Sequence, residues 1–177
     1  MADQSPAKVS IYTDGACRGN PGPGGYGVIL VSGKNCKELS AGYKRTTNNR
    51  MELLAAIVGL EALKARCDVA LCSDSSYLVD AINKNWIGGW RAKGWSRGKA
   101  GVLKNADLWQ RLDAIRQKHS VTWQWVRGHA GHAQNERCDV LATEAADGPG
   151  RLRDEGFEAA EALALAAAQD DSDQVLL

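Results

Sequence analysis

The sequence predicts a mixed α/β fold: a single sheet of five strands, the first three antiparallel and the last two parallel, flanked by helices. Two observations lead to this fold class. Three short β-rich runs come first and lie close enough in sequence to pair as a meander, and two later runs alternate with helical segments. The 177 residues, 44% of them apolar, suffice for one domain with a core of its own.

The first three strands surround a glycine-rich stretch. Runs of β-branched and aromatic residues predict strands over 9–14, 26–31 and 37–43. Residues 15–25, which include five glycines and two prolines, are expected to form a loop, and residues 32–35 a turn. The G-x-G-x-x-G pattern at 22–27 is not a dinucleotide site, because such a loop opens a helix whereas this one opens a strand.

A long helix and the remaining strands follow. The apolar-rich run 50–65 predicts a helix. Thr47, Asn48 or Asn49 can cap it, and Asn49 with Glu52 has the spacing of a capping box. The later elements are expected as a strand over 69–74, helices around 75–84 and 105–118, a strand over 121–126 and a helix over 135–146.

Charge is distributed unevenly along the chain. The net charge of +1 combines residues 158–177, which have five acids and no base, with residues 1–157 at +6 (22 basic against 16 acidic). The alanine-rich, then acidic end follows a turn at 147–150 and is expected to form a loose helix or a disordered tail. Residues 84–104 contain six Lys or Arg and no acid, which fits either a phosphate-binding surface or an ordinary solvated face.

Composition excludes several classes of protein. The longest apolar stretch, 53–60, is too short to cross a bilayer, and residues 1–10 lack the apolar segment of a signal peptide. The five cysteines are odd in number and contain no C-x-x-C pair, which argues against a disulfide framework and a zinc site. The sequence therefore predicts a cytoplasmic protein that does not engage a membrane.

Four carboxylates can meet at one edge of the predicted sheet. Asp14 and Asp74 each end a strand, and the carboxyl ends of parallel neighbours lie side by side. Glu52 and Asp139 lie in the first turns of two helices. Apolar folding gives no reason to gather like charges, whereas Mg²⁺ prefers oxygen ligands and shares phosphate oxygens with its substrate. Taken singly, each residue could equally be a solvated surface residue or a helix cap.

At these carboxylates the chain resembles the bacterial type 1 ribonucleases H over about residues 8–157. The matching stretches are Y-T-D-G-A-C-R-G-N-P-G-P-G-G-Y-G at 12–27, T-T-N-N-R-M-E-L at 46–53, S-D-S at 73–75 and G-H-A-G-H-A-Q-N-E-R-C-D at 128–139. They are long, contain rare residues and occur in the family's order. The resemblance implies a ribonuclease-H-like fold and an endonuclease that hydrolyses the RNA strand of RNA–DNA hybrids, leaving 5′-phosphate and 3′-hydroxyl ends, nearly independently of sequence.

The resemblance also implies catalytic roles. Asp14, Glu52, Asp74 and Asp139 match the four metal-binding carboxylates, which would hold two Mg²⁺ ions with substrate, Mn²⁺ being a possible replacement. His129 matches the histidine on the mobile loop before the last helix, and an imidazole can move a proton between water and product near neutral pH. His119 and His132 are interpreted as structural.

A second set of positions matches substrate-binding residues of the family. Those that line the minor groove of the hybrid or hold a phosphate are Cys17, Asn20, Thr47, Asn48 and Asn49. Ser76 stands where the family often has Gln, so that contact is in doubt. The 84–104 segment matches a basic protrusion that grips the DNA strand. Within it, Trp86 is a candidate for contact with a DNA sugar, and Lys93, Arg97 and Lys99 are candidates for contact with phosphates. Cys17 could equally be a packing residue, and Asn48 a loop or cap residue. The three tryptophans outside this basic segment, Trp109, Trp123 and Trp125, are expected in the core.

We therefore expect a catalytic domain over 1–157, a separate acidic tail over 158–177, and a monomeric enzyme. Another nuclease of the same fold is an alternative, against which the stretches at 46–52 and 129–132 discriminate. A hybrid-binding module without catalysis is a second alternative, but it should have lost a carboxylate, and all four are present.

Overall fold

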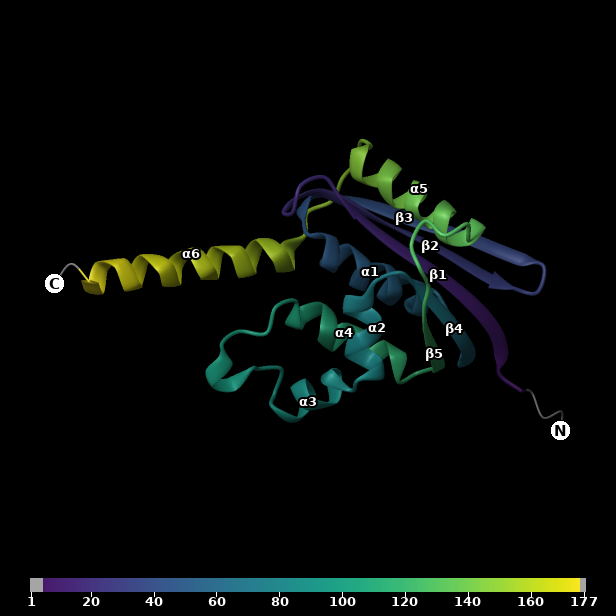
Figure 1. Cartoon of the computed structure of the whole chain (residues 1–177), viewed down its shortest axis with the longest axis horizontal. Helices are drawn as coiled ribbons and strands as arrows, with labels where there is room; N and C mark the ends of the chain where they lie inside the picture. Colours follow the sequence, from purple (N-terminus) through teal and green to yellow (C-terminus); the bar gives the residue numbers. More distant parts are fainter. Residues whose placement is uncertain (1–4, 176–177) are drawn as a thin grey trace.

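A five-stranded sheet in the order β3-β2-β1-β4-β5 is the centre of the computed structural model, which describes residues 5–175 and the side chains of residues 5–171 (Figure 1). The strands are β1 Ala7–Cys17, β2 Gly22–Ser32, β3 Asn35–Thr46, β4 Cys67–Ser73 and β5 Ser120–Trp125. Strands β1, β2 and β3 are antiparallel neighbours, and β4 and β5 run parallel to β1. The predicted fold class is confirmed.

Helices cover both faces of this sheet. They are α1 Asn48–Glu61, α2 Ser76–Asn83, α3 Trp86–Ala92, α4 Ala106–Arg116, α5 Ala133–Asp147 and α6 Glu155–Val175, with a short 3-10 helix, η1, at Gly98–Ala100. Helix α1 packs on β1 and β2 from one side with α2 and α4 beside it, and α5 lies across β1, β2 and β3 on the other (Figure 1). Between residues 5 and 175, none of the helices has the length and apolar character needed to cross a bilayer.

The main core lies between the sheet and the layer of α1, α2 and α4. Ile11 and Val28 face inward from β1 and β2, and α1 contributes the buried side chains of Leu53 and Ile57. Trp109 of α4 is fully buried here, as predicted. Because this layer is apolar and continuous, it fixes α1 against β1, and the second turn of α1 carries one of the four carboxylates, Glu52.

The glycine-rich stretch is mostly strand, so the loop predicted over 15–25 is wrong. Strands β1 and β2 remain paired as far as Cys17 with Gly24, and only the link between Cys17 and Gly22 leaves the ladder. The glycines are required by packing: a Cβ on Gly25 would lie 2.5 Å from the Ala142 carbonyl oxygen of α5. The absence of side chains therefore lets a helix approach the sheet closely.

Helix α1 begins and ends earlier than the sequence suggested. Thr47 is the N-cap, and its hydroxyl oxygen accepts a hydrogen bond from the Arg50 amide at 3.3 Å. The capping box of Asn49 with Glu52 is wrong, because Glu52 turns into the protein. The helix ends at Glu61 rather than residue 65.

The structure also adds detail to two segments of uncertain form. The basic segment 84–104 contains α3 and η1, neither of which the sequence predicted. Of the two forms expected for the C-terminal end, the structure has the helix: α6 is 21 residues long and projects away from the sheet and its helices (Figure 1). The predicted boundary between residues 157 and 158 falls inside α6, and the division into domain and tail stays a prediction.

Candidate active site

Asp14 and Asp74 lie where the pairing of β1 with β4 stops. The parallel ladder ends with Thr13 beside Ser73, so Asp14 on β1 and Asp74 just after β4 are the next residues along each chain. Strand β1 continues beyond Asp14 only through its pairing with β2. No β4 backbone therefore separates the two faces of the sheet at this point, and side chains from both faces can meet there.

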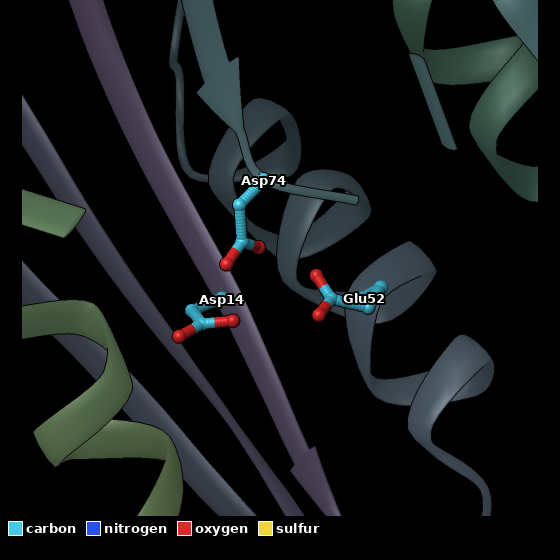
Figure 2. Close-up of side chains that lie close together, drawn as sticks. All are labelled: Asp14, Glu52 and Asp74. Atoms are coloured by element: carbon cyan, nitrogen blue, oxygen red, sulfur yellow. The ribbon is translucent and has the colours of Figure 1, made fainter. Parts of the chain in front are cut away.

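Glu52 reaches the same place from α1. Its side chain is almost fully buried, with 4% of the residue exposed. The approach of α1 to β1 is close, since a Cβ built on Gly15 would lie 2.6 Å from the Glu52 amide nitrogen. Asp14, Glu52 and Asp74 each offer an oxygen within 4.8 Å of the others, and Figure 2 shows the three carboxylates turned toward one another. Two strands and one helix thus build the cluster.

The cluster is electrostatically unfavourable without a cation. Burial, and then repulsion from Asp74, raise the pKa of Asp14 to about 7, although the Gly15 amide donates a hydrogen bond to Asp14 Oδ1 at 2.8 Å. Burial and the charges of Asp14 and Asp74 raise the pKa of Glu52 well above its ordinary value. Burial also raises the pKa of Asp74, against the opposing positive charge of His129.

The donor set fits a hard divalent cation. All three side chains offer carboxylate oxygens, which such cations prefer. Glu52 Oε2 is buried and has no hydrogen-bond partner in the part of the chain that the structure describes. A buried carboxylate oxygen without a partner costs free energy, and a bound cation at this position would offset that cost.

The other two predicted catalytic residues lie near the cluster but outside it. Asp139, half-buried in α5, is not part of the three-residue group, yet its charge still raises the pKa values of Asp14 and Asp74. His129 is exposed on the loop between β5 and α5 and has a positive φ of 55°. Such a backbone conformation is uncommon outside glycine and marks a constrained loop residue.

The sequence of the chain that carries this site matches a known protein family. Residues 6–147 match the family model for RNase H. The chain belongs to the RNase H family.

Individual relatives agree. The ribonuclease H of Lachnoclostridium phytofermentans is 62% identical over 154 residues, which is 84% of this chain and 97% of the relative. That of Shewanella amazonensis is 57% identical over 151 residues, 85% of this chain and 96% of the relative. Among solved structures, LC9-RNase H1, a type 1 RNase H with the type 2 active-site motif, is similar with a TM-score of 0.74 and 37% identity, covering 89% of this chain and 82% of that chain. LC11-RNase H1 in complex with an RNA/DNA hybrid has a TM-score of 0.59 and 27% identity, covering 78% and 96%.

In this RNase H chain, most residues predicted to bind the minor groove gather at the start of α1. The Asn20 side chain accepts a hydrogen bond from the Asn48 amide at 3.1 Å, which ties the β1–β2 link to the helix. Thr47 and Asn48 are half-buried and Asn49 is exposed. Cys17 is half-buried, and its thiol donates to the carbonyl oxygens of Gly22 and Thr46 at 3.5 Å. A packing role for Cys17 is therefore visible, and substrate contact stays a prediction.

The predicted DNA-binding side chains lie on an exposed part of the RNase H chain. Lys93, Arg97 and Lys99 are exposed and form no ion pair with any side chain described between residues 5 and 171. The other arginine of the segment, Arg91, is instead held by two hydrogen bonds to Asp113. Trp86 is 44% exposed and packs beside Trp90. Ser76 is exposed at the first position of α2.

Two features could not be predicted from the sequence, and a third, the structural role of His119, could. Trp125 is 54% exposed rather than in the core, whereas Trp123, two residues earlier, is buried as predicted. Alternation along a strand shows which residues share a face but not how far the helices cover it. Arg50 and Asp154 form a buried ion pair at 2.7 Å, and no pattern in the sequence links residues so far apart. His119 is buried, and its Nδ1 accepts from the Cys67 amide at 3.3 Å, a structural role as interpreted.

Proposed function

We propose that this chain is a metal-dependent endonuclease that hydrolyses the RNA strand of RNA–DNA hybrids. The observation that carries the proposal is the buried carboxylate cluster, with the unpartnered Glu52 Oε2, in a chain of the RNase H family. Its relatives of 53–62% identity are ribonucleases H, and LC11-RNase H1 was solved with an RNA/DNA hybrid. We expect 5′-phosphate and 3′-hydroxyl ends and little dependence on sequence.

In this proposal Asp14, Glu52 and Asp74 hold Mg²⁺, and Asp139 completes the coordination when hybrid is bound. Two bound cations would activate a water and stabilise the leaving oxygen at the scissile phosphate. His129 takes up or returns a proton at its ring nitrogen, and its exposed position lets it reach water and product. His129 lies near enough to Asp74 to lower the pKa of that carboxylate, which supports a role for His129 beside the phosphate.

Choice of RNA over DNA must depend on the 2′-hydroxyl group, since that group alone marks the sugar. The polar side chains of Asn20, Thr47, Asn48 and Asn49 and the thiol of Cys17 lie close together beside the cluster's helix and strand, which suits contact with the minor groove. Trp86, Lys93, Arg97 and Lys99 would hold the DNA strand, and Ser76 would contact the hybrid near Asp74. The protein would act as a monomer in the cytoplasm, where its five free cysteines stay reduced.

One assay tests the proposal directly. Matched hybrid, duplex DNA and duplex RNA of one sequence are incubated with the protein in Mg²⁺ and in EDTA, and the products are sized and their ends determined. We expect cleavage of the RNA strand of the hybrid in Mg²⁺ alone. Equal cleavage of duplex DNA, or undiminished cleavage in EDTA, would contradict the proposal.

A further inference from the structure

Trp125 is an exposed aromatic residue whose side chain makes one hydrogen bond within the part of the chain that the structure describes. It is the last residue of β5, and its indole Nε1–H donates a hydrogen bond to the main-chain oxygen of Asp74 at 3.0 Å. The residue is 54% exposed, while Trp123 on the same face of the strand is buried. Apolar packing therefore does not account for a tryptophan here, and the hydrogen bond is the specific interaction it makes.

The hydrogen bond acts on the short link that carries the Asp74 carboxylate. This link joins β4, which ends at Ser73, to α2, which begins at Ser76. The Val126 amide donates to the Ser73 carbonyl oxygen at 3.0 Å, and the Ser75 amide to the Ser73 hydroxyl at 3.1 Å. The Trp125 indole binds the next carbonyl, that of Asp74. The indole thus fixes the orientation of the Asp74 carbonyl and restrains the backbone from which the Asp74 carboxylate projects.

The same residue begins the loop that carries His129. Residues 126–132 follow directly, and the loop passes close to the cluster, since a Cβ on Gly128 would lie 2.6 Å from Asp74 Oδ2. The Trp125 side chain thus connects the start of the loop that carries His129 to the backbone of Asp74, one of the three clustered carboxylate residues. The outer partners of metal ligands commonly set ligand orientation in this manner.

We propose that Trp125 is a positioning residue, whose indole N–H holds the Asp74 carboxylate in the direction needed to bind a divalent cation together with Asp14 and Glu52. The proposal rests on the proposed function, because it assigns Trp125 to the same cluster. It concerns cation affinity rather than contact with nucleic acid.

The test compares two tryptophan-to-phenylalanine variants. Trp125→Phe keeps an aromatic ring and removes the N–H donor, and Trp86→Phe makes the same change at the exposed tryptophan of the basic segment. Calorimetric titration with Mg²⁺ should show about tenfold weaker binding for Trp125→Phe, and wild-type affinity for Trp86→Phe. With hybrid at fixed, subsaturating Mg²⁺, Trp125→Phe should lower kcat with little change in KM. Unchanged Mg²⁺ affinity, or a raised KM alone, would overturn the proposal.

A measurement on the wild-type protein avoids dependence on the variant folding. In ¹H–¹⁵N spectra the Trp125 indole N–H should exchange slowly with solvent despite the exposed ring, and its resonance should shift as Mg²⁺ is added. Fast exchange together with no response to Mg²⁺ would overturn the proposal. The cleavage assay of the wild type decides the proposed function independently, so failure of one inference is distinguishable from failure of the other.

Discussion

At the scale of single residues, the charge state of Asp14 couples catalysis to stability. Its folded pKa is about 7 against an ordinary value of 3.8, because burial and the neighbouring carboxylates disfavour the ionised form. The metal-free folded protein therefore binds a proton more tightly than the unfolded chain does. The stability associated with that proton is complete below about pH 4 and is lost as pH rises toward about 7.

Replacing Asp14 with Asn should abolish cleavage and stabilise the metal-free protein. At pH 7 in EDTA we expect the free energy of unfolding to rise by something on the order of 1–3 kcal/mol, since each pKa unit corresponds to about 1.4 kcal/mol. The gain should grow between about pH 4 and pH 7. Urea denaturation across this range measures it, with Asp68→Asn, at the far end of β4, as the control. A variant less stable than wild type at neutral pH would contradict the repulsive cluster.

Added Mg²⁺ should reverse the order of stability between the two proteins. A cation that binds only the folded state stabilises it by about RT ln(1 + [L]/Kd), which is roughly 2.7 kcal/mol at a hundredfold excess over Kd. The wild type should gain this stabilisation and Asp14→Asn should gain less, because one ligand is missing. Thermal melts in increasing Mg²⁺ provide the comparison, and equal shifts for both proteins would show that Asp14 does not bind the ion.

The sequence predicted the positions of some residues, but not the burial or the partners of others. Asp14 and Asp74 could be placed together because parallel strand ends meet, and Glu52 because the resemblance named it, but its burial could not be predicted from a position that also suits a cap. The exposure of Trp125 depends on how far the helices extend over that face of the sheet. The ion-pair partner of Arg50 lies about a hundred residues later in the chain, which returns to α1 only in the folded protein. Tertiary facts of this kind have no local signal.

At the scale of elements, the position of α1 depends on the missing side chain of Gly15. A Cβ at this residue would press on the backbone of Met51 and Glu52, at 2.8 Å and 2.6 Å. Gly15→Ala should therefore move α1 away from β1, destabilise the protein by about 1–3 kcal/mol and lower kcat, because Glu52 moves with its helix. Gly89→Ala in α3 meets nothing within 4 Å and should be neutral or stabilising by about 0.5–1 kcal/mol. Chemical denaturation and kinetics of both variants test this difference.

The basic segment should contribute binding rather than chemistry. Neutralising Lys93, Arg97 and Lys99 together should raise KM more than it lowers kcat, since side chains that hold phosphates bind substrate and transition state about equally. The slope of log affinity against log salt should fall by roughly one unit for each phosphate that is no longer neutralised. The matched control neutralises three other exposed lysines: Lys8, Lys34 and Lys37. An equal change in salt slope in both triple variants would mean that only net charge matters.

The order and type of the main elements could be predicted, whereas their lengths could not. Strand β1 and strand β2 each extend into residues that are interpreted as loop because glycine is rare in strands. Here glycine is needed by the helices that lie against the sheet, so packing overrides propensity. Helix α3 was missed because two glycines interrupt its seven residues, and its stability comes from buried Ile87 and from Trp90, which packs on the core.

At the scale of the whole molecule, the segment before α6 is bound to the rest of the domain through Asp154, and α6 then projects away from it. Buried Asp154 accepts hydrogen bonds from Arg50 and from the Thr46 hydroxyl at 2.7 Å, and also from the Phe157 amide at the start of α6. Arg50 is further paired with Asp107 of α4. One residue beyond the matched family region thus ties together β3, α1 and α6.

Two truncations should distinguish the contribution of Asp154 to stability from that of the rest of α6. A chain ending at Phe157 keeps Asp154 and should retain its turnover, with slightly tighter hybrid binding at low salt because five acids are removed. A chain ending at Arg153 leaves buried Arg50 without Asp154 and should lose about 2–4 kcal/mol of stability. Denaturation and hybrid titration of both chains measure these effects. Similar stability of the two chains would show that Asp154 does not secure the fold.

The projecting α6 also determines where a second protein or a surface tether can be attached to the molecule. A straight helix of 21 residues is about 30 Å long at 1.5 Å per residue, so a cargo attached after Val175 would stand well clear of the carboxylate cluster. Fusion of a fluorescent protein or a surface tether at this end should leave access to hybrid unobstructed. The same attachment placed before β1 would be joined directly to the central strand of the sheet.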